Sequence, residues 1–254
     1  MKKLFYIAAV ALLTLGMVSC HKDDDNTNNN TNNNTPTNPS NPTNPTDTTQ
    51  IARQATQGAW VDLGLSVQWY SVNLGATTPE GYGDYYAWGE VWPRNVYSWA
   101  NYTYGDYDSE TSTYTMYKYN TLESYGTVDN KTTLEASDDV ATAVLGSGAR
   151  IPTEAEWQEL LDNTTAEWTT QNGVNGRKFT AANGNSLFLP AAGYRYGSSL
   201  DLDGSRGACW SSSLYESYPG GAWNMFFSSD GQYVGSSRRN RGYGQSVRAV
   251  RSQN

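Results

Sequence analysis

Residues 149–161, ARIPTEAEWQELL, decide the fold because they specify one helix at its start and along its length. Thr153 and Glu156 have the spacing of a capping box, in which each side chain bonds to the backbone N–H of the other residue. The apolar residues recur at helical spacing and share one face: Trp157, Leu160 and Leu161. The segment therefore predicts an amphipathic helix that packs against a core.

The sequence after this helix is typical of short strands joined by tight turns. In KFTAANGNSLFLP, residues 178–190, the pair Asn183-Gly184 lies between two apolar runs, a strong signal for a β-hairpin. AWNMFFSSDGQYVG, residues 222–235, predicts a second hairpin with Asp230-Gly231 at its turn. Two more runs predict strands: GACWSSS at 207–213 and SVRAVR at 246–251.

The sequence before the helix predicts the first strands and one more helix. WVDLGLSVQWYSVNLGA, residues 60–76, alternates apolar and polar residues around Gly64 and predicts two short strands. SDDVATAVL, residues 137–145, predicts a short helix that Ser137 caps and Gly146 ends.

These elements make residues 51–254 one α+β domain with two helices and many short strands. The domain holds all nine Trp residues of the chain, and we expect Trp60, Trp69 and Trp88 to lie in its core. Residues 97–131 are rich in Tyr, Thr and Asp and show little periodicity. We expect this stretch to lie as surface excursions over the core.

Composition excludes several function classes. The 254 residues include 17 Lys plus Arg against 25 Asp plus Glu, and the net charge of -8 argues against nucleic acid as a partner. The single histidine, His21, lies in what reads as a tail, so the domain has no histidine for a catalytic triad, a zinc site or a haem.

The first twenty residues have the layout of a bacterial lipoprotein signal. Lys2 and Lys3 precede an apolar run, residues 4–18, that is too short to span a membrane comfortably as a retained helix. The junction Met17-Val18-Ser19-Cys20 is similar to a relaxed lipobox, so Cys20 is expected to carry the lipid, such as palmitate, at the mature N-terminus. An ordinary signal peptide followed by a chance cysteine is the alternative.

The next segment, residues 21–50, is predicted to be a disordered tether. His21-Lys22-Asp23-Asp24-Asp25 resembles the short Lys-Asp/Glu signal that sends Bacteroidota-type lipoproteins to the outer face of the outer membrane, although a solvated charge run has the same composition. Residues 26–50 are all Asn, Thr, Pro, Ser, Asp or Gln and have no apolar surface to offset chain entropy. We therefore expect a domain held away from the cell outer membrane, facing the exterior.

Several segments of the domain resemble known families. ARIPTEAEWQELL is similar to a helix start in the formylglycine-generating-enzyme (sulfatase-modifying factor) family, whose fold is a C-type-lectin-like variant. Other segments, spread over residues 59–251, resemble the Fibrobacter succinogenes major paralogous domain of surface lipoproteins: WVDLGLSVQWYSVNLGATTPEGYGDYYAWGE, YNTLESYGTVDNKTTLEASDD, NGNSLFLPAAGYR, CWSSS and GQSVRAV. The resemblance implies a C-type-lectin-like fold of the formylglycine-generating-enzyme-like variant.

The same fold family includes the variable proteins of diversity-generating retroelements, in which a C-terminal stretch is diversified to change ligand specificity. The matching stretch here is residues 214–244, and its composition is typical of adaptable binding surfaces. The resemblance implies ten ligand-binding residues in it: Tyr215, Tyr218, Trp223, Asn224, Ser228, Tyr233, Arg238, Arg239, Asn240 and Tyr243. We expect most of them to cluster on one exposed face, supported from beneath by Trp210, Phe226, Val247 and Val250.

The resemblance to an oxidase does not extend to its chemistry. The enzymes carry a pair of cysteines near the C-terminus, whereas RRNRGYGQSVRAVR contains none. Cys209 stands alone beside Trp210, and no histidine is available to lower the pKa of its thiol. We therefore expect Cys209 to be a small buried hydrophobic residue, and the chain to be neither an enzyme nor the holder of a cofactor.

Two acidic patterns have ordinary structural explanations. Asp201 and Asp203 alternate as carboxylates do in calcium loops, but the rest of an EF-hand is missing and a solvated turn explains them. Trp223-Asn224-Met225 departs from the Trp-Asn-Asp of calcium-dependent lectins, so we expect no metal. Three acids of the second helix are explained by the capping box and the helix dipole: Glu154, Glu156 and Glu159.

The sequence as a whole predicts a surface-displayed lipoprotein whose head is a non-catalytic binding module for a protein or glycan ligand. The basic run Arg238-Arg239-Asn240-Arg241 could clamp an anionic ligand, or it could simply balance an acidic domain. Two other functions stay open. One is an oxidase of the formylglycine-generating type, and the other is a structural or adhesive surface protein without a defined pocket.

Overall fold

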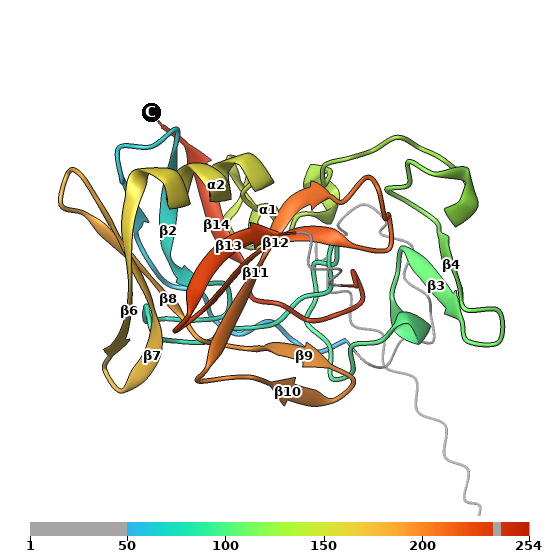
Figure 1. Ribbon diagram of the computed structural model, residues 1–254, viewed down its shortest axis with the longest axis horizontal. Helices are drawn as coiled ribbons and strands as arrows, with labels where there is room; N and C mark the ends of the chain where they lie inside the picture. Colours follow the sequence, from blue (N-terminus) through green and yellow to red (C-terminus); the bar gives the residue numbers. More distant parts are fainter. Residues whose placement is uncertain (1–49, 236–239, 254) are drawn as a thin grey trace, which may run out of the picture. The chain divides into compact units, whose positions relative to one another are not determined.

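The computed structural model describes residues 50–235 and 240–253, which form a mostly β domain with two α-helices (Figure 1). All strand pairs among these residues are antiparallel, and they build five small sheets. The α+β class predicted from the sequence is confirmed. The strands are β1 (Trp60–Val61), β2 (Val67–Asn73), β3 (Gly105–Asp108), β4 (Thr113–Met116), β5 (Ala149–Arg150), β6 (Thr164–Gln171), β7 (Val174–Ala181), β8 (Ser186–Pro190), β9 (Tyr194–Tyr196), β10 (Ser199–Asp201), β11 (Arg206–Leu214), β12 (Ala222–Ser228), β13 (Gly231–Gly235) and β14 (Arg248–Ser252).

A four-stranded sheet pairs the beginning of the domain with its end. Its order is β1-β2-β14-β5, so the last strand of the chain lies between strands from the first half. Val250 in β14 is opposite both Trp69 in β2 and Arg150 in β5. The two short strands predicted around Gly64 are confirmed as β1 and β2.

The helix α2 (Glu154–Asn163) begins as its sequence predicts. The Thr153 hydroxyl accepts the N–H of Glu156, and the Glu156 carboxylate accepts the N–H of Thr153 at 2.8 Å, which completes the capping box. Trp157 is fully buried, and its indole N–H donates to the carbonyl of Trp210 at 3.2 Å. The ring of Trp157 also packs on that of Trp69, with centroids 4.7 Å apart.

The other helix, α1 (Val140–Leu145), starts later than predicted. Asp139 is its N-cap, because the Asp139 carboxylate accepts the N–H groups of Ala141 and Thr142. The prediction of Ser137 as the cap is wrong, since Ala136–Asp138 form a 3-10 turn, η3, ahead of the helix. The predicted stop at Gly146 is confirmed.

Two three-stranded sheets follow α2 and share a core with it. The hairpin β7–β8 turns at Asn183-Gly184, as predicted, whereas the hairpin β12–β13 turns at Ser229-Asp230, one residue before the predicted pair, because Gly231 already pairs with Ser228. Side chains from α2 and from both sheets meet in one buried cluster, which includes Trp157, Phe179, Leu189, Met225 and Phe227.

A second buried cluster is centred on tryptophans whose indole N–H groups bond to the backbone. Trp88 donates to the carbonyl of Ser211 and Trp210 donates to the carbonyl of Tyr86, both at 2.7 Å. The core positions predicted for Trp69 and Trp88 are confirmed, while Trp60 is half-buried and packs against this cluster.

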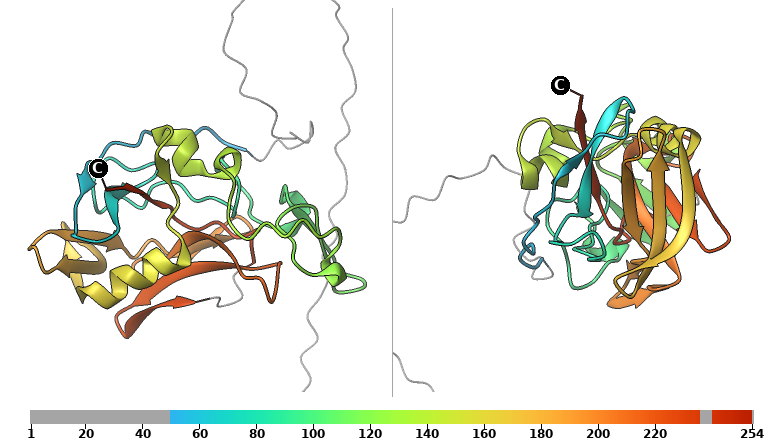
Figure 2. Two further views of the ribbon diagram at one scale, coloured as in Figure 1. Left: turned by 90° about the horizontal axis from the view of Figure 1, so that it is seen from above. Right: turned by 90° about the vertical axis from the view of Figure 1, so that its left-hand side faces the viewer.

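Residues 97–131 are more ordered than the expectation of surface excursions. They contain the hairpin β3–β4 and the 3-10 turns η1 (Trp99–Asn101) and η2 (Glu123–Tyr125). The hairpin lies at the end of the domain opposite β6 and β7 (Figures 1 and 2). Tyr102, Tyr104 and Tyr119 of this stretch are buried, because their rings pack on one another and on core side chains. No helix within the described ranges is long and apolar enough to cross a membrane.

Candidate ligand-binding face

Two segments that are distant in the predicted binding stretch lie side by side in the structure. The loop of residues 215–221 pairs with the segment of residues 240–244 through a bridge between Gly221 and Asn240. The N–H of Arg241 donates to the carbonyl of Gly220 at 3.0 Å. We call these two segments, together with Trp223 at the start of β12, the C-terminal face.

Arg241 fixes this face to the rest of the domain from below. Its side chain is fully buried, and the guanidinium donates to the carbonyls of Pro219 at 2.9 Å and Tyr119 at 3.1 Å. It also donates to the Tyr102 hydroxyl at 2.8 Å and lies over the Trp88 ring, 4.8 Å from its centroid. Arg241 therefore cannot take part in the anion clamp considered for the basic run, and that hypothesis is wrong for this residue.

The predicted binding residues differ in exposure. Five are half-buried side chains of the C-terminal face: Tyr215, Tyr218, Trp223, Asn240 and Tyr243. Ser228 is half-buried at the end of β12, and Tyr233 in β13 is exposed. Asn224 is fully buried, so its expected place on an exposed face is wrong. Arg238 and Arg239 lie outside the described residues, as does Cys20.

Asn224 is buried because it forms an amide pair with Gln245 beneath the face. The Asn224 side-chain N–H donates to the side-chain oxygen of Gln245 at 3.0 Å. Both side chains are fully buried, and among the described residues Asn224 Oδ1 and Gln245 Nε2 have no protein hydrogen-bond partner. Six other buried side-chain atoms in the described ranges share this property, so it does not distinguish this pair.

Aromatic contacts extend the C-terminal face onto the β3–β4 hairpin. The Tyr218 ring meets the rings of Tyr114 and Tyr125 edge to face, at 5.9 and 5.7 Å. Tyr114 also contacts Tyr107, at 4.6 Å. The sequence analysis missed these three tyrosines. The density of tyrosine in residues 97–131 was the only signal that pointed to them.

A second extension comes from the strand β9. Tyr243 lies parallel to Tyr194, with ring centroids 6.1 Å apart, and contacts Tyr196 at 4.9 Å. The backbone holds this arrangement, because Arg195 and Gly244 exchange two hydrogen bonds. Sequence reasoning missed Tyr194 and Tyr196, although their alternation around Arg195 places both rings on one side of a strand.

Tyr233 belongs to a different part of the sheet. Its ring contacts Phe226 at 5.3 Å, and the two residues are opposite each other in the β12–β13 pair. Tyr215 instead meets Trp223 edge to face at 5.5 Å. The four supporting residues expected beneath the stretch are all buried: Trp210, Phe226, Val247 and Val250.

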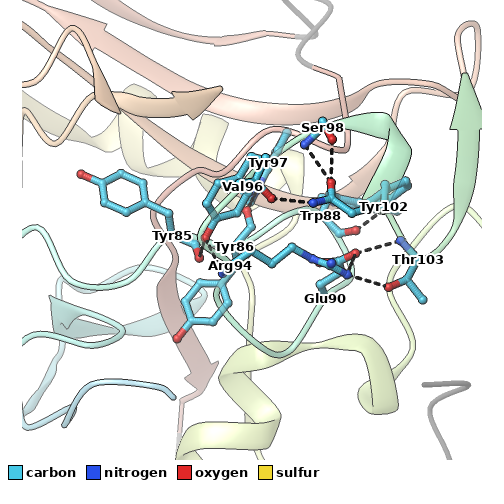
Figure 3. Close-up of polar contacts among 12 residues, drawn as sticks. Tyr85, Tyr86, Trp88, Glu90, Arg94, Val96, Tyr97, Ser98, Tyr102 and Thr103 are labelled. Carbon is cyan, nitrogen blue, oxygen red and sulfur yellow. Dashed lines mark hydrogen bonds and ion pairs between the residues drawn. The ribbon is translucent and has the colours of Figure 1, made fainter. Parts of the chain in front are cut away.

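The backbone of residues 85–103 is irregular and is held by polar side chains (Figure 3). Arg94 makes a two-point ion pair with Glu90, and Arg94 Nη2 also donates to the Thr103 hydroxyl at 3.1 Å. The Tyr97 hydroxyl donates to the carbonyl of Tyr85 at 2.5 Å and accepts the N–H of Arg94 at 2.9 Å. Gly244 has no room for a side chain, because a Cβ would lie 2.8 Å from the Tyr97 ring.

The residues considered for catalysis or metal binding have structural roles. Cys209 is buried, and desolvation raises the pKa of its thiol to about 12, so the thiol stays protonated at neutral pH. The Glu156 carboxylate bonds to Arg150 and to the capping backbone. Asp201 lies in β10 and Asp203 in the turn after it. The part of the chain that the structure describes contains no group of three or more potential metal-ligating side chains.

Comparison of the chain with protein-family models, with curated proteins and with solved structures finds no match.

Proposed function

We propose that this chain is a surface-anchored, non-catalytic binding protein whose head has a C-type-lectin-like fold of the formylglycine-generating-enzyme-like variant. The pairing of β2 with β14 supports the fold, because the segments that carry the resemblance begin and end the domain and lie together in one sheet. The capping box that starts α2 supports it as well, since ARIPTEAEWQELL is the segment that resembles a helix start of that family.

The binding function rests on a difference in burial between the aromatic rings of the C-terminal face and the polar side chains beneath them. Its aromatic rings are half-buried, so each keeps an accessible part, whereas Arg241 and Gln245 beneath them are fully buried and bonded. Tyrosine and tryptophan give a large contact area at a low cost in conformational entropy. A face of such rings on a fixed base is suited to a protein or glycan ligand.

Two alternative functions receive less support. An oxidase of the formylglycine-generating type needs a reactive thiol, and burial keeps the Cys209 thiol protonated. An adhesive protein without a defined binding site would not need partly accessible aromatic rings gathered on a backbone that Arg241 fixes.

The anchor belongs to the same proposal. Cys20 would carry the lipid at the outer membrane, and residues 21–50 would hold the head away from it. The protein would then face the exterior, and residues 214–244 would be a stretch diversified as in retroelement variable proteins. The Cys20→Ala protein should move from membrane to soluble fractions. Continued partition with membranes would place the anchor elsewhere.

The binding function is tested with the chain from residue 21 onward. The immobilised protein is offered a panel of purified glycans and surface proteins, and each ligand that binds is measured again with Trp223→Ala. The matched control is Trp92→Ala, which removes a tryptophan that is 39 % exposed and lies outside the C-terminal face. Trp223→Ala should cost about 2 kcal/mol of binding free energy or more, and Trp92→Ala almost nothing. Equal losses in the two variants would overturn the assignment of the ligand to this face.

A further inference from the structure

A cleft of about 130 Å³ lies behind the strand β9, on the side away from Tyr194 and Tyr196. Its wall includes Gln54, Asp84, Tyr85, Asn95, Tyr97 and Arg195. The Arg195 guanidinium lies over the Tyr85 ring, 5.0 Å from its centroid. The ring in turn is fixed, because the Tyr85 hydroxyl donates to the carbonyl of Ala192 at 2.5 Å.

The charged groups in the wall of this cleft have different partners. Arg94 forms an ion pair with Glu90. Asp84 is satisfied by neutral donors, since it accepts the backbone and side-chain N–H groups of Gln54 at 2.8 and 2.9 Å and the Tyr86 hydroxyl at 3.2 Å. Arg195 has no carboxylate partner within ion-pair distance among the described residues.

Arg195 is half-buried and lines the cleft, so its side chain is partly withdrawn from water. Most of the described arginines have no carboxylate within ion-pair distance, and Asp84 lies in the same wall, so the position of Arg195 at the cleft, and not its lack of an ion pair, makes it a candidate donor. Its contact with the Tyr85 ring helps to hold the guanidinium beside the cleft.

We propose that this cleft binds the carboxylate group of a ligand, with two parallel hydrogen bonds from the Arg195 guanidinium. The planar fork of arginine matches the two oxygens of a carboxylate. Asp84 lies in the same wall, so the cleft offers a fork of donors and not an excess of positive charge, which favours a carboxylate over a phosphate dianion. The cleft has room for the carboxylate group, and the rest of the ligand extends toward the exposed side chains of Ile51 and Asn95 at its wall.

This site is separate from the proposed function, because Arg195 points away from the rings that contact Tyr243. The two sites nevertheless share the strand β9, whose Arg195 is hydrogen-bonded through its backbone to Gly244. The two sites can therefore be tested separately. If no carboxylate binds in the cleft, the proposal for the C-terminal face still stands. If no ligand binds to the C-terminal face, the cleft can still bind a carboxylate.

The test uses the full chain and three small probes at constant ionic strength and neutral pH: sodium glucuronate, N-acetylglycine and glucose. Titration calorimetry should detect glucuronate or N-acetylglycine but not glucose, and the preferred acid tells whether a sugar acid or a peptide C-terminus supplies the carboxylate. Arg195→Gln should weaken binding about tenfold or more, which is about 1.4 kcal/mol. Arg195→Lys should weaken it less, because lysine keeps the charge but loses the fork.

The matched control is Arg206→Gln, since Arg206 also lies over an aromatic ring, that of Phe226, but outside the cleft. It should leave the affinity unchanged. A measurement on the unmodified chain covers the case in which Arg195→Gln fails to fold: the Nε–H resonance of Arg195 should shift with glucuronate and stay in place with glucose. The proposal is overturned if neither acid binds, if Arg195→Gln binds as well as the unmodified chain, or if inorganic phosphate binds more tightly than both acids.

Discussion

Two regions of this domain are held together by different means. The sheet side, which comprises α2, β6–β8 and β11–β13, is built from regular elements whose apolar side chains fill one cluster. The loop side, which comprises residues 84–131 and the C-terminal face, has little regular structure. Its backbone is held by buried polar side chains, among them Arg94, Tyr97 and Arg241.

The comparison teaches that stability on the two sides should depend on different properties. Removal of volume should be the main cost on the sheet side, because the side chains there contribute mostly apolar surface. Removal of a single donor or acceptor should be costly on the loop side, because it leaves a buried backbone group unpaired. A binding face on the loop side can then vary its exposed rings while the bonds beneath them stay the same.

The largest effect is expected for Trp157→Ala in α2. The substitution removes the side chain that connects α2 to Trp69 and to the carbonyl of Trp210. We expect a loss of about 4 kcal/mol in the free energy of unfolding, measured by urea denaturation. Trp168→Ala in β6 is the control, since Trp168 is only half-buried, and its loss should be clearly smaller. Equal losses would mean that the cluster on the sheet side does not depend on filled volume.

Arg241→Met should cost about 3 kcal/mol although it removes little volume. The change leaves the carbonyls of Lys118, Tyr119 and Pro219 without their donor. Urea denaturation again gives the free energy of unfolding. Arg251→Met, near the end of β14, is the control, because Arg251 is only half-buried. A cost below about 1 kcal/mol for Arg241→Met would show that packing, and not hydrogen bonding, holds the loop side.

Two carboxylates at the starts of the two helices should give opposite pH dependences. Burial raises the pKa of Asp139 to about 6 from the ordinary 3.8, even though backbone N–H groups of Ile151, Thr142 and Ala141 oppose the change. The folded state therefore keeps this proton when the unfolded chain has lost it. The contribution of Asp139 to stability is full below pH 3.8 and falls as the pH rises to 6. Asp139→Asn should thus destabilise the protein more at pH 4 than at pH 7, by on the order of 2 kcal/mol.

Glu156 is the matched group for this measurement. Burial acts to raise its pKa, but hydrogen bonds from Arg150 and from the backbone of Thr153 outweigh burial and hold the pKa below its usual value. Its contribution is present at neutral pH and is lost in acid, so Glu156→Gln should cost more at pH 7 than at pH 3. The same pH trend for both substitutions would contradict the assignment of one buried and one ion-paired carboxylate.

Tyr97→Phe should have an effect similar in size to that of Asp139→Asn. The hydroxyl of Tyr97 serves the carbonyl of Tyr85 and the N–H of Arg94, so its removal leaves two buried backbone groups unpaired at a cost of about 2 kcal/mol. Tyr117→Phe is the control, because Tyr117 is 61 % exposed, and it should change the melting temperature very little. Equal melting temperatures for Tyr97→Phe and Tyr117→Phe would show that side-chain hydrogen bonds do not hold these loops.

The sheet side could be predicted from sequence because its signals are local. The capping box of Thr153 and Glu156 and the turn at Asn183-Gly184 act within a few residues of themselves. The loop side could not be predicted in this way. Arg241 donates to residues more than a hundred positions away, and nothing in its sequence neighbourhood shows that the residue is buried.

The candidate site was predictable in part for the same reason. The composition of residues 214–244 pointed to Tyr215, Tyr218 and Tyr243, which are half-buried in two segments that lie side by side. Asn224 was misplaced, because an asparagine between apolar residues of a strand reads as outward-facing when its partner Gln245 is not known. The tyrosines that β9 and the β3–β4 hairpin add to the face become visible only when the chain is folded.

The central claim, that the C-terminal face binds a ligand and is not part of the core, is tested most directly by an alanine scan of residues 214–244. Affinity for the ligand and melting temperature are measured on each variant. The account predicts that Tyr218→Ala and Tyr243→Ala lower affinity with little change in melting temperature, and that Asn224→Ala lowers both, because its amide is buried. A loss of affinity that follows the loss of melting temperature at every position would show that the stretch is core, and would contradict the account.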